Sequence, residues 1–99
     1  MPAYVLVEAE ELDEERALEY RALAQRSIHQ YGGVYRLRGV VPEAAEGTWP
    51  SPARVTTLVE FPDMTRLREW YGSPEYQHAK AVREGAIEVR LLFAEDRTE

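Results

Sequence analysis

The chain contains no cysteine, and this absence excludes several kinds of chemistry. Disulfides, thiolate zinc sites, iron–sulfur ligation and cysteine nucleophiles cannot occur in its 99 residues. Histidine is scarce as well, since His29 and His78 are the only two and lie on different predicted helices without the spacing of a local metal site. We therefore expect no metal centre and interpret both histidines as ordinary helix-surface residues.

Signatures of nucleotide binding and of serine hydrolysis are also missing. Gly32-Gly33 leads from a predicted helix into a predicted strand, which is the wrong polarity for a loop that cradles phosphate. The serines at positions 27, 51 and 73 lie outside any G-x-S-x-G motif. The sequence predicts no cofactor and no serine hydrolase activity.

Basic residues are outnumbered by acidic ones, with 12 lysines and arginines against 18 aspartates and glutamates. The formal net charge is -6, which opposes the phosphate backbone of nucleic acids. The residues from Met1 to Val7 lack the basic and apolar regions of a signal peptide, and no apolar run is long enough to span a bilayer. We therefore expect a cytoplasmic protein that binds neither nucleic acid nor a membrane.

What the chain does contain is a strand and helix pattern that occurs twice. Tyr4–Ala9 is a valine-rich strand segment, Asp13 can cap a helix with an apolar stripe that includes Tyr20, and Val34–Arg38 alternates as a second strand. A proline-containing loop over residues 40–53 follows. The pattern then recurs as a strand, two capped helical segments and a last strand: Val55–Phe61, helices after Asp63 and Ser73, and Glu88–Ala94.

Two β-α-β halves in series predict an α+β domain of the ferredoxin-like type. In this split β-α-β arrangement, four antiparallel strands carry both helices on one face. The chain length suits one domain over residues 1–99. We expect Gly33 to take a left-handed conformation at the end of the first helix. Trp70, Tyr71 and Tyr76 could form a wall of a small-molecule cavity, but we interpret them as core packing, since aromatic residues spaced along a helix most often pack on the sheet.

Such a sheet leaves one face without helices, and alternation predicts which residues line each side. The residues expected under the helices are Val5, Val7, Tyr35, Leu37, Val89, Leu91 and Phe93. Those expected on the open face are Tyr4, Leu6, Glu8, Val34, Arg36, Arg38, Thr56, Leu58, Glu60, Arg90 and Leu92. A mixture of aliphatic and charged side chains is what two copies would bury against each other, so we predict a homodimer. The arginines would pair with Glu8 and Glu60 across that interface or converge on an anionic ligand, and we expect the ion pairs.

One string of residues resembles a known family. The chain resembles the pattern of the family called domain of unknown function 1330 at Glu60-Phe61-Pro62-Asp63, Trp70–Tyr76 and Arg83. The likeness extends over nearly the whole chain, since it includes Tyr31-Gly32-Gly33, Arg38-Gly39 and Gly47-Thr48-Trp49. Asp63 departs from the usual Phe-Pro-Ser start of the family's helix, but it caps equally well. The resemblance implies the dimeric α/β-barrel superfamily, in which two ferredoxin-like sheets face one another. No general activity comes with the family, although the superfamily includes small monooxygenases, lactone isomerases and haem-dependent enzymes.

The residues are compatible with two functions. In the first, a cavity of the dimer binds or transforms a small anionic molecule; it lies between sheet and helices or between the two sheets, and its expected ligand-binding residues are Tyr4, Arg36, Arg38, Glu60 and Arg90. Arginine would hold the anion, and a desolvated Glu60 could shuttle a proton. In the second, the protein is a non-catalytic structural or regulatory dimer whose mixed face serves only self-association. A polar cavity with an unpaired arginine would favour the first, and a dry, ion-paired interface the second.

Overall fold

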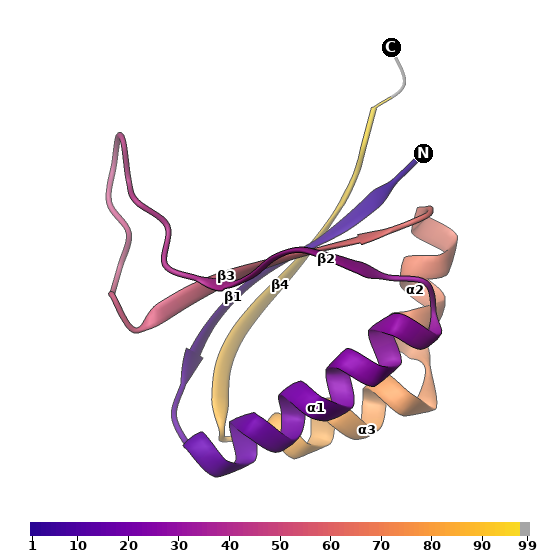
Figure 1. Ribbon diagram of the computed structural model, residues 1–99, viewed down its shortest axis with the longest axis horizontal. Coiled ribbons are helices and arrows are strands. Elements are labelled where there is room, and N and C mark those ends of the chain that lie inside the picture. Colours follow the sequence, from indigo (N-terminus) through magenta and orange to yellow (C-terminus); the bar gives the residue numbers. More distant parts are fainter. Residues whose placement is uncertain (98–99) are drawn as a thin grey trace.

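The computed structural model describes residues 1–97 and contains a four-stranded antiparallel sheet with helices on one face only. The elements in chain order are β1 (Ala3–Glu11), α1 (Glu14–Gln30), β2 (Val34–Val40), β3 (Arg54–Phe61), α2 (Met64–Gly72), α3 (Pro74–Arg83) and β4 (Ile87–Glu95). The strand order across the sheet is β2-β3-β1-β4. This is the predicted ferredoxin-like arrangement, and Figure 1 shows the helices on one side of the sheet and the other side open. No helix among the described residues is long and apolar enough to cross a membrane.

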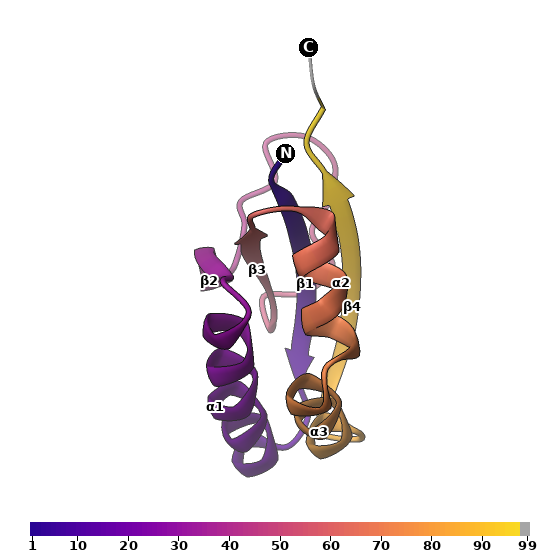
Figure 2. The ribbon, with the colours of Figure 1, turned by 90° about the vertical axis from the view of Figure 1, so that its right-hand side faces the viewer.

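The helices begin where the sequence places capping residues. The side chain of Asp13 accepts a hydrogen bond from the backbone N–H of Arg16 at 3.1 Å, and Asp63 accepts one from Arg66 at 2.8 Å. Ser73 ends α2 and caps α3, with its hydroxyl accepting from the N–H of Tyr76 at 3.1 Å. The extended backbone at Ser73 breaks the helical path, so α3 leaves the direction of α2 and packs beside α1 (Figure 2).

The fully buried core lies towards one end of the sheet. It joins the start of β1 and the end of β3 to all three helices through Ala3, Val5, Ala24, Ile28, Val59, Phe61, Leu67, Trp70, Tyr76 and Ala79. Further along the same face, Val7, Val55, Val89 and Leu91 are only partly buried. Side-chain packing is therefore dense at one end of the layer between sheet and helices and loose at the other.

An irregularity in β2 corrects the predicted facing of two residues. Tyr35 pairs with Val59, but Leu37 pairs with Leu58, so one extra residue is inserted between these two rungs. A bulge of this kind reverses the alternation beyond it. Leu37 therefore lies on the open face, where it is 47% exposed, and Arg38 lies on the helix side; the predicted positions of both were wrong.

The glycine pair after α1 also differs from the expectation. Gly32, with a φ of 86°, takes the left-handed conformation, and Gly33 does not. Gly33 instead permits a close approach, because a Cβ atom there would lie 2.6 Å from Cγ2 of Ile28 and 2.9 Å from Cζ of Phe61. Glycine is required at this position by packing and not by its backbone angles.

This packing predicts opposite effects for the same substitution at two glycines. Gly33→Ala should lower the free energy of unfolding by about 1–3 kcal/mol, since the added methyl overpacks the contact with Ile28 and Phe61. Gly72→Ala, at a helical position with nothing near the new Cβ, should raise it by about 0.5 kcal/mol. Urea denaturation of both variants measures the difference, and equal effects would contradict the packing argument.

Candidate functional site

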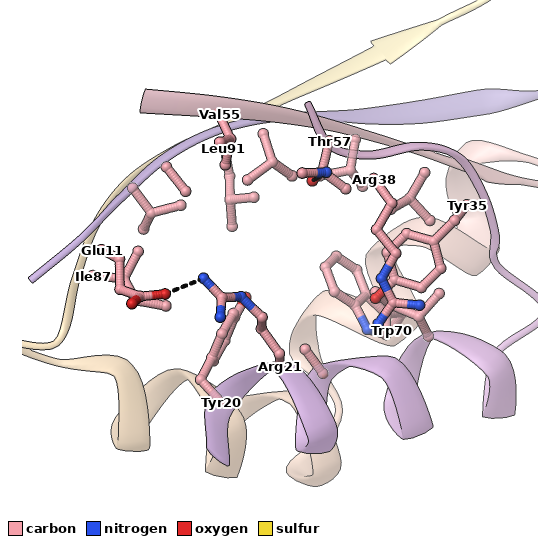
Figure 3. Close-up of a pocket in the computed structure, with 18 of the residues that line it drawn as sticks. Glu11, Tyr20, Arg21, Tyr35, Arg38, Val55, Thr57, Trp70, Ile87 and Leu91 are labelled. Atoms are coloured by element: carbon pink, nitrogen blue, oxygen red, sulfur yellow. Dashed lines mark hydrogen bonds and ion pairs between the residues drawn. The ribbon is translucent and has the colours of Figure 1, made fainter. Parts of the chain in front are cut away.

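A cavity of about 630 Å³ lies between the helix-facing side of the sheet and α1 (Figure 3). Its sheet wall is aliphatic and comes from β1, β3 and β4, with Val7, Val55, Val89 and Leu91 among its members. Small side chains leave the space open, since Ala9, Ala24 and Ala53 line it where larger residues would fill it. The helix α1 packs against α3 and so does not collapse onto this part of the sheet.

Arg38 brings a positive charge to the cavity. Its Nη2 donates a hydrogen bond to Oε1 of Gln25 at 2.8 Å, and its guanidinium lies 4.3 Å from the centre of the Tyr35 ring. Among residues 1–97 no carboxylate forms an ion pair with it. The stacked ring and the neutral amide hold the guanidinium in place without neutralising it.

A second arginine lies at the opposite end of the cavity and is neutralised. Arg21 on α1 forms an ion pair with Glu11 at the end of β1, as the dashed line in Figure 3 shows. This pair links the helix to the sheet beside the cavity. Of these two arginines, Arg38 can therefore bind an anion without first breaking an ion pair.

Between α1 and α3 lies a cluster of two phenols and an arginine. The hydroxyl oxygens of Tyr20 and Tyr76 are 3.0 Å apart, and Nη1 of Arg83 donates to both, at 3.3 Å and 2.5 Å. Tyr76 is fully buried, and this burial raises the pKa of its phenol, so that it stays protonated. Of the two phenols, Tyr20 lines the cavity.

Trp70 forms part of the cavity wall and has a satisfied polar atom. Its indole Nε1 donates to Oγ of Ser27 at 3.0 Å, and that hydroxyl donates to the carbonyl of Ala24 at 2.8 Å. This chain of hydrogen bonds is complete within the protein. Trp70 therefore presents an apolar ring surface to the cavity and offers no free donor.

The open face of the sheet carries a row of four leucines that crosses all four strands. Leu37 pairs with Leu58, Leu58 with Leu6, and Leu6 with Leu92. Residues paired in this way present their side chains on the same face. Leu6, Leu37 and Leu92 are 39%, 47% and 47% exposed, so this leucine row is an apolar stripe without cover in a single chain.

Ion pairs flank the leucine row on both sides. Arg36 donates to Glu60 at 2.9 Å on one side, and on the other Glu8 pairs with Arg90 and, at 3.2 Å, with Arg54. The hydrogen bond from Arg90 is the main reason that the pKa of Glu8 lies below its ordinary value. Arginines thus pair with Glu8 and Glu60 within one chain, and pairing of these residues across a dimer interface stays a prediction.

The structure divides the predicted ligand-binding residues between two faces. Tyr4, Arg36 and Glu60 lie at one end of the open face, since Tyr4 and Glu60 are paired in register and Arg36 bonds to Glu60. Arg90 lies on the same face beyond the leucine row, paired with Glu8. Arg38 alone among the five borders the cavity. Ligand binding by the four open-face residues stays a prediction.

Sequence reasoning missed the cavity residues for identifiable reasons. The apolar stripe of the helix accounts for Tyr20, and core packing accounts for Trp70 and Tyr76, which agrees with their burial. Trp70 also lines the cavity, which is the alternative that the sequence leaves open for it. The polar contact of Tyr20 with Tyr76 joins residues 56 positions apart and has no local signal. An arginine at position 83 with no acidic neighbour in the preceding turn of its helix was the one available hint.

Comparison with known families identifies the chain. Residues 2–96 match the family described as a domain of unknown function (DUF1330). The chain belongs to this family. The predicted family is thereby confirmed, and it assigns no reaction to the DUF1330 fold. No curated protein matches the chain significantly.

Solved structures share the fold at low sequence identity. The RPA0582 protein of unknown function from Rhodopseudomonas palustris is 16% identical, with a TM-score of 0.75 over 99% of this chain and 84% of that one. A dimeric ferredoxin-like protein of unknown function from Jannaschia sp. CCS1 is 17% identical, with a TM-score of 0.71 over 97% and 100% of the two chains. SnoaB, a cofactor-independent oxygenase from Streptomyces nogalater, is 9% identical, with a TM-score of 0.59 over 99% and 95%. These likenesses confirm the fold.

Proposed function

We propose that this DUF1330 protein binds a small, mainly apolar molecule that carries an anionic group, in the cavity between the sheet and α1. The observation that carries the proposal is the cavity itself, with aliphatic walls and an arginine that has no carboxylate partner among the described residues. A volume of about 630 Å³ is within the range of small-molecule sites, which are usually apolar with a few placed polar groups.

The chemistry of Arg38 supports an anionic group on the ligand. Stacking on Tyr35 and the hydrogen bond to Gln25 occupy one face and one nitrogen of the guanidinium, and other N–H groups stay available. A carboxylate or a similar oxyanion can accept two parallel hydrogen bonds from an arginine. The aliphatic wall would then bury the apolar part of the same molecule.

One structural neighbour also favours small-molecule chemistry in this fold. SnoaB is described as a cofactor-independent oxygenase, so a related backbone supports a reaction without a bound cofactor in that protein. Fold likeness alone does not carry a reaction to this chain. Binding in the cavity is the function that we propose here.

Two naphthalene dyes test the role of Arg38. Anilinonaphthalene sulfonate is apolar with one anionic group, and phenylnaphthylamine is a neutral analogue of similar shape. We expect Arg38→Gln to weaken binding of the sulfonate about tenfold, because a charge-assisted hydrogen bond is lost, and to leave the neutral dye nearly unaffected. Dye fluorescence during titration with protein measures both affinities.

Arg36→Gln is the matched control for this experiment. Arg36 lies two residues away on the same strand, but it pairs with Glu60 on the open face. Its replacement should leave both dye affinities unchanged. Equal losses in the two variants, or no binding of either dye by the wild type, would contradict the proposed site.

We propose, in addition, that a second copy of the chain covers the leucine row on the open face. The leucines are exposed in one chain and are flanked by ion pairs, which is the composition of a two-fold interface with an apolar centre and a polar rim. The neighbour from Jannaschia sp. CCS1 is described as dimeric. Self-association by this face and ligand binding in the cavity use opposite sides of the sheet, so one protein can do both.

Introducing a charge into the leucine row should split this dimer. Leu6→Asp would bury a carboxylate at the centre of the interface, and we expect the sedimentation equilibrium mass to fall from two chains to one. Leu18→Asp is the control, since Leu18 is 66% exposed on α1, away from this face. A Leu6→Asp protein that sediments like the Leu18→Asp protein would rule out this interface.

A further inference from the structure

We infer that Tyr20 is the hydrogen-bond donor that the cavity presents to its ligand, held in place by Tyr76 and Arg83. This inference rests on the proposed function and narrows the ligand class. The bound molecule would carry an acceptor oxygen, such as a ketone or quinone carbonyl, in addition to the anionic group that Arg38 binds.

The geometry of the three side chains is a triangle of hydrogen bonds. The phenol oxygens of Tyr20 and Tyr76 are 3.0 Å apart, and Arg83 Nη1 is 3.3 Å from the first and 2.5 Å from the second. The side chains come from α1 and α3, and their edge-to-face rings, with centroids 6.4 Å apart, fix the phenols relative to each other. Figure 3 shows Tyr20 rising from α1 beside Arg21, at the boundary of the cavity.

Counting protons in this triangle identifies the free donor. Arg83 can only donate, so its Nη1 supplies hydrogen to both phenol oxygens. Each phenol has one proton of its own, and only one of them can lie between the two oxygens. Tyr76 is fully buried, and the acceptor for its proton among the described residues is Tyr20. A buried hydroxyl without an acceptor is costly, so Tyr76 donates to Tyr20.

The hydroxyl proton of Tyr20 is then the one without an acceptor in the described part of the chain. Because Tyr20 borders the cavity, this proton is available to a molecule bound there. Its oxygen accepts hydrogen bonds from a neutral phenol and from a guanidinium, and both draw electron density away from it. The Tyr20 O–H is therefore a stronger donor than a phenol in water.

Arg83 has a positioning role in this arrangement. It forms none of the ion pairs among residues 1–97, and its contacts are with the two phenols, whose ring centres lie 5.5 Å and 5.9 Å from its guanidinium carbon. The guanidinium is only partly buried and places its positive charge beside the phenol oxygen of Tyr20. A charge that polarises Tyr20 towards the cavity accounts for its presence.

The fluorescent ketone prodan tests this inference directly. Prodan is a neutral naphthalene whose emission moves to longer wavelength when its carbonyl accepts a hydrogen bond. We expect prodan bound to the wild type to emit at longer wavelength than prodan bound to Tyr20→Phe, whose emission should move towards the value in an aprotic solvent. The affinity should fall about three- to tenfold, and the affinity for phenylnaphthylamine, which has no carbonyl, should not change.

Tyr31→Phe is the matched control, because it removes a tyrosine hydroxyl just after the same helix. The Tyr31 hydroxyl donates to Glu75 at 3.1 Å, and Tyr31 does not line the cavity, so the long-wavelength emission should persist in that variant. Urea denaturation of both variants identifies the conditions in which each is folded. A prodan spectrum that is the same with and without the Tyr20 hydroxyl, or that changes equally in Tyr31→Phe, would overturn the assignment.

The same titrations separate this inference from the proposed function. If the wild type binds phenylnaphthylamine and prodan but the prodan spectrum is independent of Tyr20, this inference is wrong and the proposed cavity stands. If the wild type binds none of the naphthalene probes, the proposed function fails and the inference fails with it.

Discussion

The contact between α1 and the sheet at Gly33 determines where the rest of the layer is filled and where it is empty. Ile28 and Phe61 lie so close to Gly33 that a Cβ atom there would collide with both. The helix is thereby fixed to the sheet near its C-terminal end. Near its N-terminal end, Arg16 donates to the carbonyls of Val82 and Glu84, at 3.0 Å and 2.5 Å, which attaches α1 to the end of α3. Held in these two places, α1 spans the sheet without closing on its middle, and the cavity is the space that remains.

The bulge in β2 places the two arginines of that strand on opposite faces of the sheet. Arg36, before the reversal, pairs with Glu60 on the open face, and Arg38, after it, reaches the cavity. Without the extra residue, alternation would place both arginines on the open face and an aliphatic Leu37 in the cavity. One inserted residue therefore supplies a leucine to the open-face row and a cation to the other side of the sheet.

The strands, helices and caps of this chain could be predicted from sequence because their signals are local. Asp13, Asp63 and Ser73 cap helices through contacts three residues away, and period-two alternation identified the faces of β1, β3 and β4. The facing of Leu37 and Arg38 could not be predicted, because a bulge depends on the register with the neighbouring strand and has no distinctive residue here. A cavity between sheet and helices is one of the two places predicted for a ligand, but its lining could not be predicted, since it results from small side chains on several elements and from the distance between α1 and the sheet. Of the predicted ligand-binding residues, Arg38 borders the cavity, and it does so because of the bulge in β2.

The most direct test of this account is methyl NMR of the protein during titration with anilinonaphthalene sulfonate. The two faces of the sheet carry different reporters, because Val7, Val55 and Val89 line the cavity and Leu6, Leu58 and Leu92 belong to the open-face row. We predict that the methyl signals of Val7, Val55 and Val89 shift on binding while those of Leu6, Leu58 and Leu92 stay in place. Shifts confined to the methyl groups of Leu6, Leu58 and Leu92 would show that the dye binds the open face and would contradict the assignment of the site to the cavity.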